Sequence, residues 1–248
     1  MADESVLDFH TYLGQDAHGD HSQTVDELIA TMDACQVDQA VVAPFLDFPG
    51  PDPQIHRALY ESWRRFPERL IPFARLDPRY GRQALEELVF VVDKLGFKGL
   101  LFDPASTRSL PYHPKVLSLM QAAAEREIPV LIPTGNAYVG LPEQVAVLAA
   151  RMPSLKIVLG HMGTAAHALR AIHLASRYDN LYLETSLQQS PFRLPLCFQA
   201  VDERRVLFGS AAPYSHPYAE LVKIQVAGIS PREKAMVLGT NARALLGL

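Results

Sequence analysis

The sequence lacks several features that would place it in other classes of protein. It has only two cysteines, Cys35 and Cys197, in 248 residues, too few for a disulfide framework or a cysteine-based zinc site. No stretch approaches the roughly 20 uninterrupted apolar residues that a membrane span needs. The acidic start Met1-Ala2-Asp3-Glu4-Ser5 has no basic residue followed by an apolar run, so no signal peptide is expected. We therefore expect a soluble cytoplasmic protein with reduced thiols.

Clusters of basic residues are also missing. The formal net charge is −4, and the 23 lysines and arginines are scattered along the chain. Phosphate binding needs a clustered basic face, and an anionic membrane surface attracts basic runs. Neither nucleic acid nor a membrane is therefore expected as a partner. The sequence does not decide the oligomeric state, and a homo-oligomer is one of the open alternatives.

The sequence does contain a regular alternation of strand-like and helix-like segments. Eight short apolar runs bounded by turn residues begin 25 to 34 residues apart. They are Ser5–His10, Gln39–Ala43, Leu70–Ala74, Lys98–Phe102, Pro129–Pro133, Lys156–Gly160, Leu181–Glu184 and Val206–Gly209. Continuous apolar runs suit a parallel sheet covered on both faces. Eight such units predict a single α/β domain over residues 1–248, a (β/α)8 barrel of the TIM type.

The segments between these runs have helical patterns. Thr24-Val25-Asp26-Glu27 is a capping box, and apolar residues then recur on one helix face as far as Cys35. Similar apolar stripes cover 85–95 and 116–123. An open, doubly wound sheet is the alternative architecture. No GxGxxG motif or P-loop follows the first strand, which weakens that alternative.

The expected C-terminal ends of the strands carry the residues that suggest chemistry, as is usual in such barrels. Among them are Asp8-Phe9-His10-Thr11-Tyr12, Pro133-Thr134-Gly135, Gly160-His161-Met162-Gly163 and Phe208-Gly209-Ser210-Ala211-Ala212-Pro213. In order and spacing these motifs resemble the amidohydrolase-related branch of the amidohydrolase superfamily, almost end to end. That branch contains metal-dependent decarboxylases and a metal-independent lactonase. The resemblance therefore implies a barrel that acts on a small carboxylated or carbonyl-bearing molecule.

The chain departs from that family at the positions where relatives bind a metal. The family motif D-x-H-x-H keeps its first histidine as His10 but has Tyr12 at the second. Pro133 and Ala211 stand where relatives carry a liganding histidine and an aspartate, and His161 is retained. A catalytic zinc site needs about three protein ligands and an open position. We therefore expect no tightly bound metal and no cofactor.

Four side chains are the catalytic candidates. His10 and His161 should project toward the same barrel mouth, where one imidazole acts as a general base or acid; the alternative is a pair of inherited, hydrogen-bonded histidines. Tyr12 either stabilises an oxyanion or fills the space left by the metal. Glu184 either acts as a base or caps a turn.

A second group of residues is expected to contact the substrate: Arg75, Asp103, Thr134, Asn136, Ser210, Tyr214 and His216. Arg75 suits a carboxylate, unless it pairs with Asp77 or Glu184. Asp103 and the others have local turn or surface roles as their alternatives. The polar segment Asp16–His21 is interpreted as a solvated loop rather than a set of metal ligands.

Two classes of function follow from these residues. The first is a metal-independent enzyme that hydrolyses a lactone or an amide, with a lyase or cyclisation step as a variant. The second is a non-catalytic pseudoenzyme that binds a small molecule. Alanine at position 211 weighs against simple hydrolysis, because the metal-free lactonase of the family relies on the carboxylate usually found there.

Overall fold

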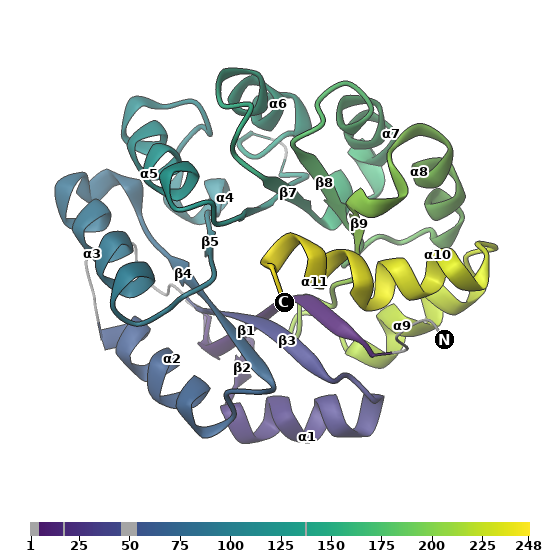
Figure 1. Ribbon diagram of the computed structural model, residues 1–248, viewed down its shortest axis with the longest axis horizontal. Coiled ribbons are helices and arrows are strands. Elements are labelled where there is room, and N and C mark those ends of the chain that lie inside the picture. The colour runs from purple at the N-terminus through teal and green to yellow at the C-terminus, as the bar shows by residue number, and fades with distance from the viewer. Residues whose placement is uncertain (1–4, 17, 46–53, 137) are drawn as a thin grey trace.

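The computed structural model describes residues 5–16, 18–45, 54–136 and 138–248. Residues 1–4, on which the expectation about a signal peptide partly rested, lie outside this range. The strands form one nine-stranded sheet in the order β2-β1-β3-β4-β5-β6-β7-β8-β9. Figure 1 shows the strands as an inner ring with the helices arranged around it.

Eight of these strands are parallel and correspond one to one with the eight expected segments. They are β1 (Leu7–Gln15), β3 (Gln39–Pro44), β4 (Leu70–Arg75), β5 (Gly99–Leu101), β6 (Val130–Pro133), β7 (Ile157–Gly160), β8 (Leu181–Glu184) and β9 (Val206–Leu207). The ring closes because the Phe9 amide donates to the Phe208 carbonyl (2.9 Å) and the Tyr12 amide to the Ala212 carbonyl (2.8 Å). The predicted TIM-type barrel is confirmed.

Helices follow the strands as the apolar stripes predicted. The longer helices are α1 (Val25–Cys35), α2 (Gln54–Arg65), α3 (Arg82–Asp93), α5 (Pro114–Glu125), α6 (Pro142–Arg151), α7 (Thr164–Ala175), α8 (Leu194–Ala200) and α9 (Pro217–Val226). The capping box at Thr24 and Glu27 is present. The short strand β2 (Ser22–Gln23), antiparallel to β1, was not expected. No helix in the described ranges is long and apolar enough to cross a membrane.

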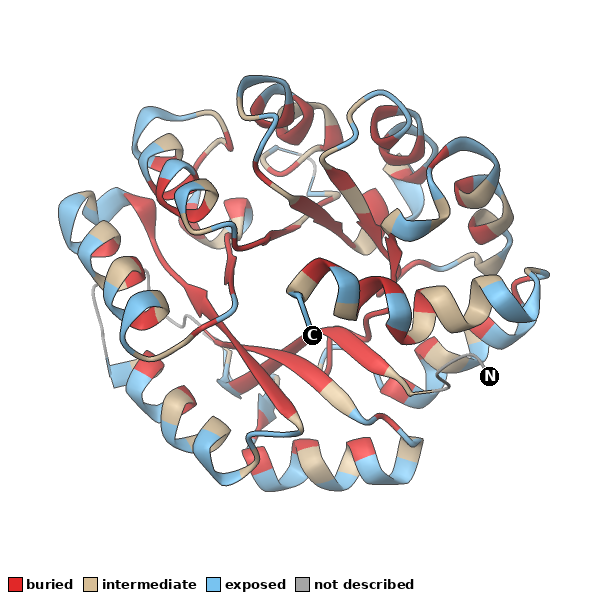
Figure 2. Ribbon diagram, in the orientation of Figure 1, coloured by how far each residue is buried: buried red, intermediate tan, exposed pale blue. Residues whose placement is uncertain are grey.

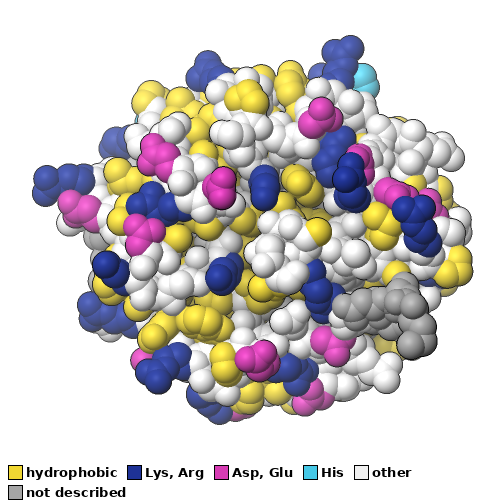
Figure 3. All heavy atoms as spheres, viewed as in Figure 1, with side chains coloured by type: hydrophobic (Ala, Val, Ile, Leu, Met, Phe, Trp, Pro, Cys, Tyr) yellow, Lys and Arg dark blue, Asp and Glu magenta, His cyan; other side chains and the backbone are white. Residues whose placement is uncertain are grey.

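The N-terminal end of the barrel is covered by the last part of the chain. Helix α10 (Pro231–Ala235), a π-helical turn and α11 (Asn241–Leu246) run together across the ring in Figure 1. Arg243 donates to the Ser5 carbonyl just before β1, and Asn241 donates to the Val206 carbonyl at the start of β9. The opposite, C-terminal end is therefore the one left for chemistry. On the face drawn in Figure 3, side chains of both charge signs are interspersed.

The barrel interior is filled with apolar side chains, and the strands that enclose it are buried in Figure 2. Phe9 and Phe73 meet edge to face with ring centroids 5.6 Å apart. The ring of Phe73 lies so close to Gly99 that a Cβ atom there would overlap it. Glycine at position 99 is thus a packing requirement of the interior.

We expect Gly99→Ala to destabilise the protein by about 1–3 kcal/mol, the usual cost of overpacking a filled core. Urea denaturation measures this loss. In a Phe73→Leu background the added methyl group should cost less, because the smaller side chain leaves room for it. Equal losses in both backgrounds would contradict the packing explanation.

Candidate active site

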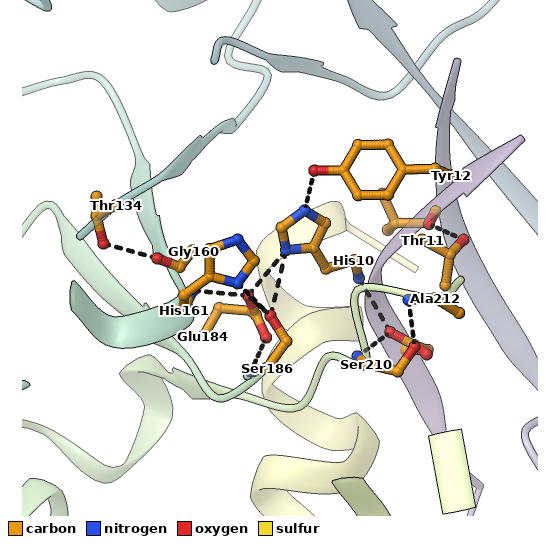
Figure 4. A network of polar contacts seen from close by, with 12 residues as sticks. His10, Thr11, Tyr12, Thr134, Gly160, His161, Glu184, Ser186, Ser210 and Ala212 are labelled. Carbon is orange, nitrogen blue, oxygen red and sulfur yellow. Dashed lines mark hydrogen bonds and ion pairs between the residues drawn. The ribbon is translucent and has the colours of Figure 1, made fainter. Parts of the chain in front are cut away.

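His10 lies at a β-bulge in β1. In the pairing of β1 with β3, Asp8 opposes Ala40 and Thr11 opposes Val42, so β1 contains one extra residue between these pairs. A bulge re-aims a side chain locally. The His10 side chain is fully buried and takes part in the polar network of Figure 4.

The carboxylate of Glu184, at the end of β8, is the centre of this network (Figure 4). It accepts hydrogen bonds from the His161 amide (3.1 Å) and the Ser186 hydroxyl (2.8 Å), and also from the Ser186 amide. Its Oε2 lies 3.0 Å from His10 Nδ1. Burial alone would raise the pKa of Glu184, but the bonds and the two imidazoles outweigh it and lower the pKa. Glu184 is therefore ionised at neutral pH.

Tyr12 extends the network on the other side of His10. Its hydroxyl lies 2.7 Å from His10 Nε2. Its ring stacks on Phe45, and the Arg75 guanidinium lies 5.4 Å from the ring centroid. Burial raises the pKa of Tyr12, so the phenol stays protonated. Since an ionised Glu184 can only accept, His10 Nδ1 carries the proton between them. When His10 Nε2 has no proton, it accepts from the Tyr12 hydroxyl.

His161 is the second imidazole of the site, directly after β7. Its ring stacks on that of His10 with centroids 4.9 Å apart, and its Nδ1 lies 2.7 Å from Ser186 Oγ. Burial is the main cause that lowers the pKa of His161, to about 4. His161 and Met162 have φ values of 62° and 47°, a strained conformation for residues with side chains. Strain of this kind gathers at functional sites.

Two contributors to this geometry were not singled out from the sequence. Ser186 follows the expected strand end by two residues and links His161 to Glu184. Gly209 lies so close to Glu184 that a Cβ atom would overlap the carboxylate, and it would also come within 3.0 Å of His10 Cβ. Both stand inside motifs visible in the sequence, but nothing local distinguishes them from ordinary turn residues.

Arg75, at the end of β4, pairs with a partner that was not expected. Its guanidinium binds Asp103 at 3.0 Å, rather than Asp77 or Glu184, and Asp77 binds Arg79 instead. Its Nε has no hydrogen-bond partner among the described residues. The role of Arg75 and Asp103 in binding a substrate stays a prediction.

Four further binding candidates form hydrogen bonds between their side chains and nearby backbone atoms: Thr134, Asn136, Ser210 and His216. Thr134, for example, donates to the Gly160 carbonyl at 2.6 Å and accepts from the Gly163 amide at 2.9 Å. His216 is the N-cap of α9. These contacts are the local roles given above as alternatives, and substrate binding by these four residues stays a prediction.

The segment Asp16–His21, of which Ala17 lies outside the described residues, forms the turn between β1 and β2. The carboxylate of Asp16 binds His21 Nδ1 at 2.9 Å. The His21 ring contacts that of Tyr214 at 4.6 Å, and Tyr214 in turn contacts Tyr12 at 5.6 Å. The turn is thus more than a solvated loop, because His21 contacts Tyr214, and Tyr214 packs against Tyr12 in the site.

The sequence of this barrel matches the amidohydrolase family over residues 16–248. The chain belongs to this family. No curated protein matches the sequence. Among solved structures, the chain is similar to 5-carboxyvanillate decarboxylase from Sphingomonas paucimobilis, with a TM-score of 0.79, 17% identity, and coverage of 99% of this chain and 100% of the other.

Two further structures have the same fold at similarly low identity. The 2,6-dihydroxybenzoate decarboxylase from Rhizobium has a TM-score of 0.78 at 18% identity, covering 98% of this chain and 99% of the other. A dihydroxybenzoic acid decarboxylase from Polaromonas has a TM-score of 0.76 at 17% identity, covering 99% and 97%, and contains manganese and 2-nitroresorcinol. At such identities the likeness shows the fold alone.

The manganese in that neighbour raises the question of which groups here are close enough to bind an ion. Within the described ranges, His10, His161 and Glu184 offer ligand atoms that all lie within 4.8 Å of one another. The sequence pointed only to the two imidazoles. The structure therefore adds the Glu184 carboxylate to the possible metal ligands. Whether an ion can bind depends on how many of these ligand atoms are free of other hydrogen bonds.

Asp8 is a second buried carboxyl group behind the network. Its Oδ1 accepts from the His10 amide (3.1 Å) and the Ser210 amide (2.8 Å), while Oδ2 has no partner in the described part of the chain. Burial raises the pKa of Asp8 from 3.8 to about 7. Between these two pH values the folded protein keeps a proton that the unfolded chain releases. Stability due to Asp8 therefore falls as pH rises across this window.

We expect Asp8→Asn to gain stability relative to the wild type as pH rises from 4 to 7, by up to about 4 kcal/mol. The asparagine keeps an oxygen for the two amides but cannot ionise. Urea denaturation at several pH values measures the difference, with the exposed Asp179→Asn as the matched control. A difference between Asp8→Asn and wild type that stays constant with pH would contradict the raised pKa.

Proposed function

We propose that this member of the amidohydrolase family is a lyase, which removes carbon dioxide from a small carboxylic acid without a metal. The observation that carries the proposal is the hydrogen-bonded chain Glu184–His10–Tyr12, a carboxylate, an imidazole and a phenol in series. Such a chain is suited to moving one proton to and from the phenol. The decarboxylase activity named for the structural neighbours supports the same reaction class.

The proposed step consumes one proton. When the site takes up a proton, His10 becomes an imidazolium beside ionised Glu184, and its Nε2–H donates to Tyr12 Oη. The Tyr12 proton then faces the substrate. The bond between the substrate carbon and its carboxylate breaks, the electron pair left on carbon takes the Tyr12 proton, and carbon dioxide leaves. The Nε2 proton of His10 passes to Tyr12, which returns the site to its starting state. The Arg75 cation beside the Tyr12 ring stabilises negative charge that develops on its oxygen.

Hydrolysis, the reaction favoured from the sequence, is less well supported. Water activation needs a base whose pKa lies near the working pH. His161, with a pKa lowered to about 4, is a weak base, and Ala211 supplies no carboxylate. Protonation of carbon by Tyr12 requires neither group.

The donor atoms of the site do not fit a tightly held metal. Both ring nitrogens of His10 are engaged, one with Glu184 and one with Tyr12. Both oxygens of Glu184 already accept hydrogen bonds. Of the donors on these three residues, His161 Nε2 is the one with no hydrogen bond to the described residues. One free imidazole nitrogen falls short of the three ligands that a catalytic metal needs.

The proposal is tested with Tyr12→Phe, which keeps the aromatic ring on Phe45 and removes only the hydroxyl. We expect a loss of about 10²- to 10⁴-fold in turnover, the usual contribution of a general acid. Carbon dioxide release is measured with a panel of small acids that includes 5-carboxyvanillate and 2,6-dihydroxybenzoate. Tyr182→Phe, on β8 outside the network, is the matched control and should retain full rate.

Other results would replace the proposal. Release of carbon dioxide at equal rates by wild type and Tyr12→Phe would remove Tyr12 from the chemistry. Turnover of lactones or amides without carbon dioxide release would favour hydrolysis. Binding of the acids without any turnover would favour the pseudoenzyme.

We expect the purified protein to contain well under one equivalent of zinc or manganese, because its donor atoms are bound to one another. Elemental analysis measures the content, and the reaction rate is compared before and after treatment with EDTA. The rate should be unchanged. Stoichiometric metal, or activity that EDTA abolishes and added Mn²⁺ restores, would sink the metal-free assignment.

A further inference from the structure

Three buried polar side chains line one small cavity beside the barrel wall. The cavity lies between the end of β8 and the helices α8 and α9, and Thr185, Gln188 and Glu220 line it. Their exposed fractions are 5%, 5% and 3%. Thr185 Oγ1 and Gln188 Oε1 have no hydrogen-bond partner in the described ranges. Buried polar groups are nearly always paired with protein or ordered water, so a shared partner between them is called for.

The surrounding contacts show which polar atoms of these three side chains are already bonded. The Nε2 of Gln188 donates a hydrogen bond to the Thr164 carbonyl at 3.2 Å, which leaves Oε1 as the free acceptor. One oxygen of Glu220 accepts from Ser215 Oγ at 2.7 Å, and the other pairs with Lys223. The cavity therefore presents two oxygen acceptors, from Gln188 and Glu220, and one hydroxyl that can donate.

The size and charge of the cavity decide the kind of ligand. The space open to a water-sized sphere is about 10 Å³, close to what one water molecule needs. The ammonium of Lys223 opposes a cation there, and the carboxylate of Glu220 opposes an anion. A neutral molecule with two donor hydrogens and a free lone pair satisfies all three groups. We infer that the cavity binds one water molecule, which donates to Gln188 Oε1 and Glu220 Oε2 and accepts from the Thr185 hydroxyl.

This water holds together segments that carry the active-site residues. Thr185 directly follows Glu184, and Met162, which also lines the cavity, directly follows His161. Ser215, which binds Glu220, directly follows Tyr214. The water thus supports the network from behind β8, in a place that no substrate needs to reach. The inference does not depend on the proposed reaction.

The first test is direct observation in the wild-type protein. A high-resolution crystal structure should contain one water peak within hydrogen-bond distance of Thr185 Oγ1, Gln188 Oε1 and Glu220 Oε2. Oxygen-17 relaxation in solution should detect one fewer long-lived water in Thr185→Val than in wild type. An empty cavity in the crystal, or equal numbers of long-lived waters, would overturn the inference.

The sign of a stability change provides a second test. With a water present, Thr185→Val loses a hydrogen bond and should lower Tm by about 2–4 °C. With a dry cavity, the same substitution removes an unpaired buried hydroxyl and should raise Tm. Thr185→Ser retains the hydroxyl and should keep the long-lived water. A Tm for Thr185→Val that is unchanged or higher would reject the water site.

Discussion

The polar end of this barrel depends on keeping the Glu184 carboxylate charged while it is completely buried. An ion removed from water is destabilised by several kcal/mol unless its oxygens are paired. Here the required hydrogen bonds come from β1 through His10, from the end of β7 through the His161 amide, and from the loop after β8 through Ser186. Gly209 lets β9 approach the same carboxylate. Groups from β1, from the end of β7 and from the loop after β8 bind the carboxylate directly, and β9 packs against it at Gly209. The charged site therefore depends on the closed barrel.

The same carboxylate makes the two histidines chemically different although their rings are stacked. The His10 ring binds Glu184 directly, whereas the His161 ring is linked to Glu184 through the Ser186 hydroxyl. His161 is left neutral, with a pKa of about 4, and His10 has a carboxylate on one side and a phenol on the other. Environments that separate the protonation behaviour of neighbouring groups are how a protein divides acid and base roles. The division here follows from the connectivity of the network.

The sequence was sufficient for the eight strands because each is a local apolar run, and the spacing of 25 to 34 residues reflects one strand and one helix. It also placed His10, Tyr12, His161 and Glu184 at one end, since the residue after a parallel strand always lies at its C-terminal edge. It did not reveal the bulge at His10 or the pairing of Arg75 with Asp103. Both depend on the register of neighbouring strands, which no local pattern records.

The backbone next to the network is strained at several residues. His161, Met162 and Ala211 all have positive φ values, and such conformations cost of order 1–3 kcal/mol each in residues with side chains. The Ala211 amide donates to the His10 carbonyl at 2.7 Å. The strained backbone is held in place by two hydrogen bonds of the network, from the Ala211 amide to the His10 carbonyl and from the His161 amide to Glu184. These bonds offset the strain, so the unusual backbone and the buried carboxylate depend on each other.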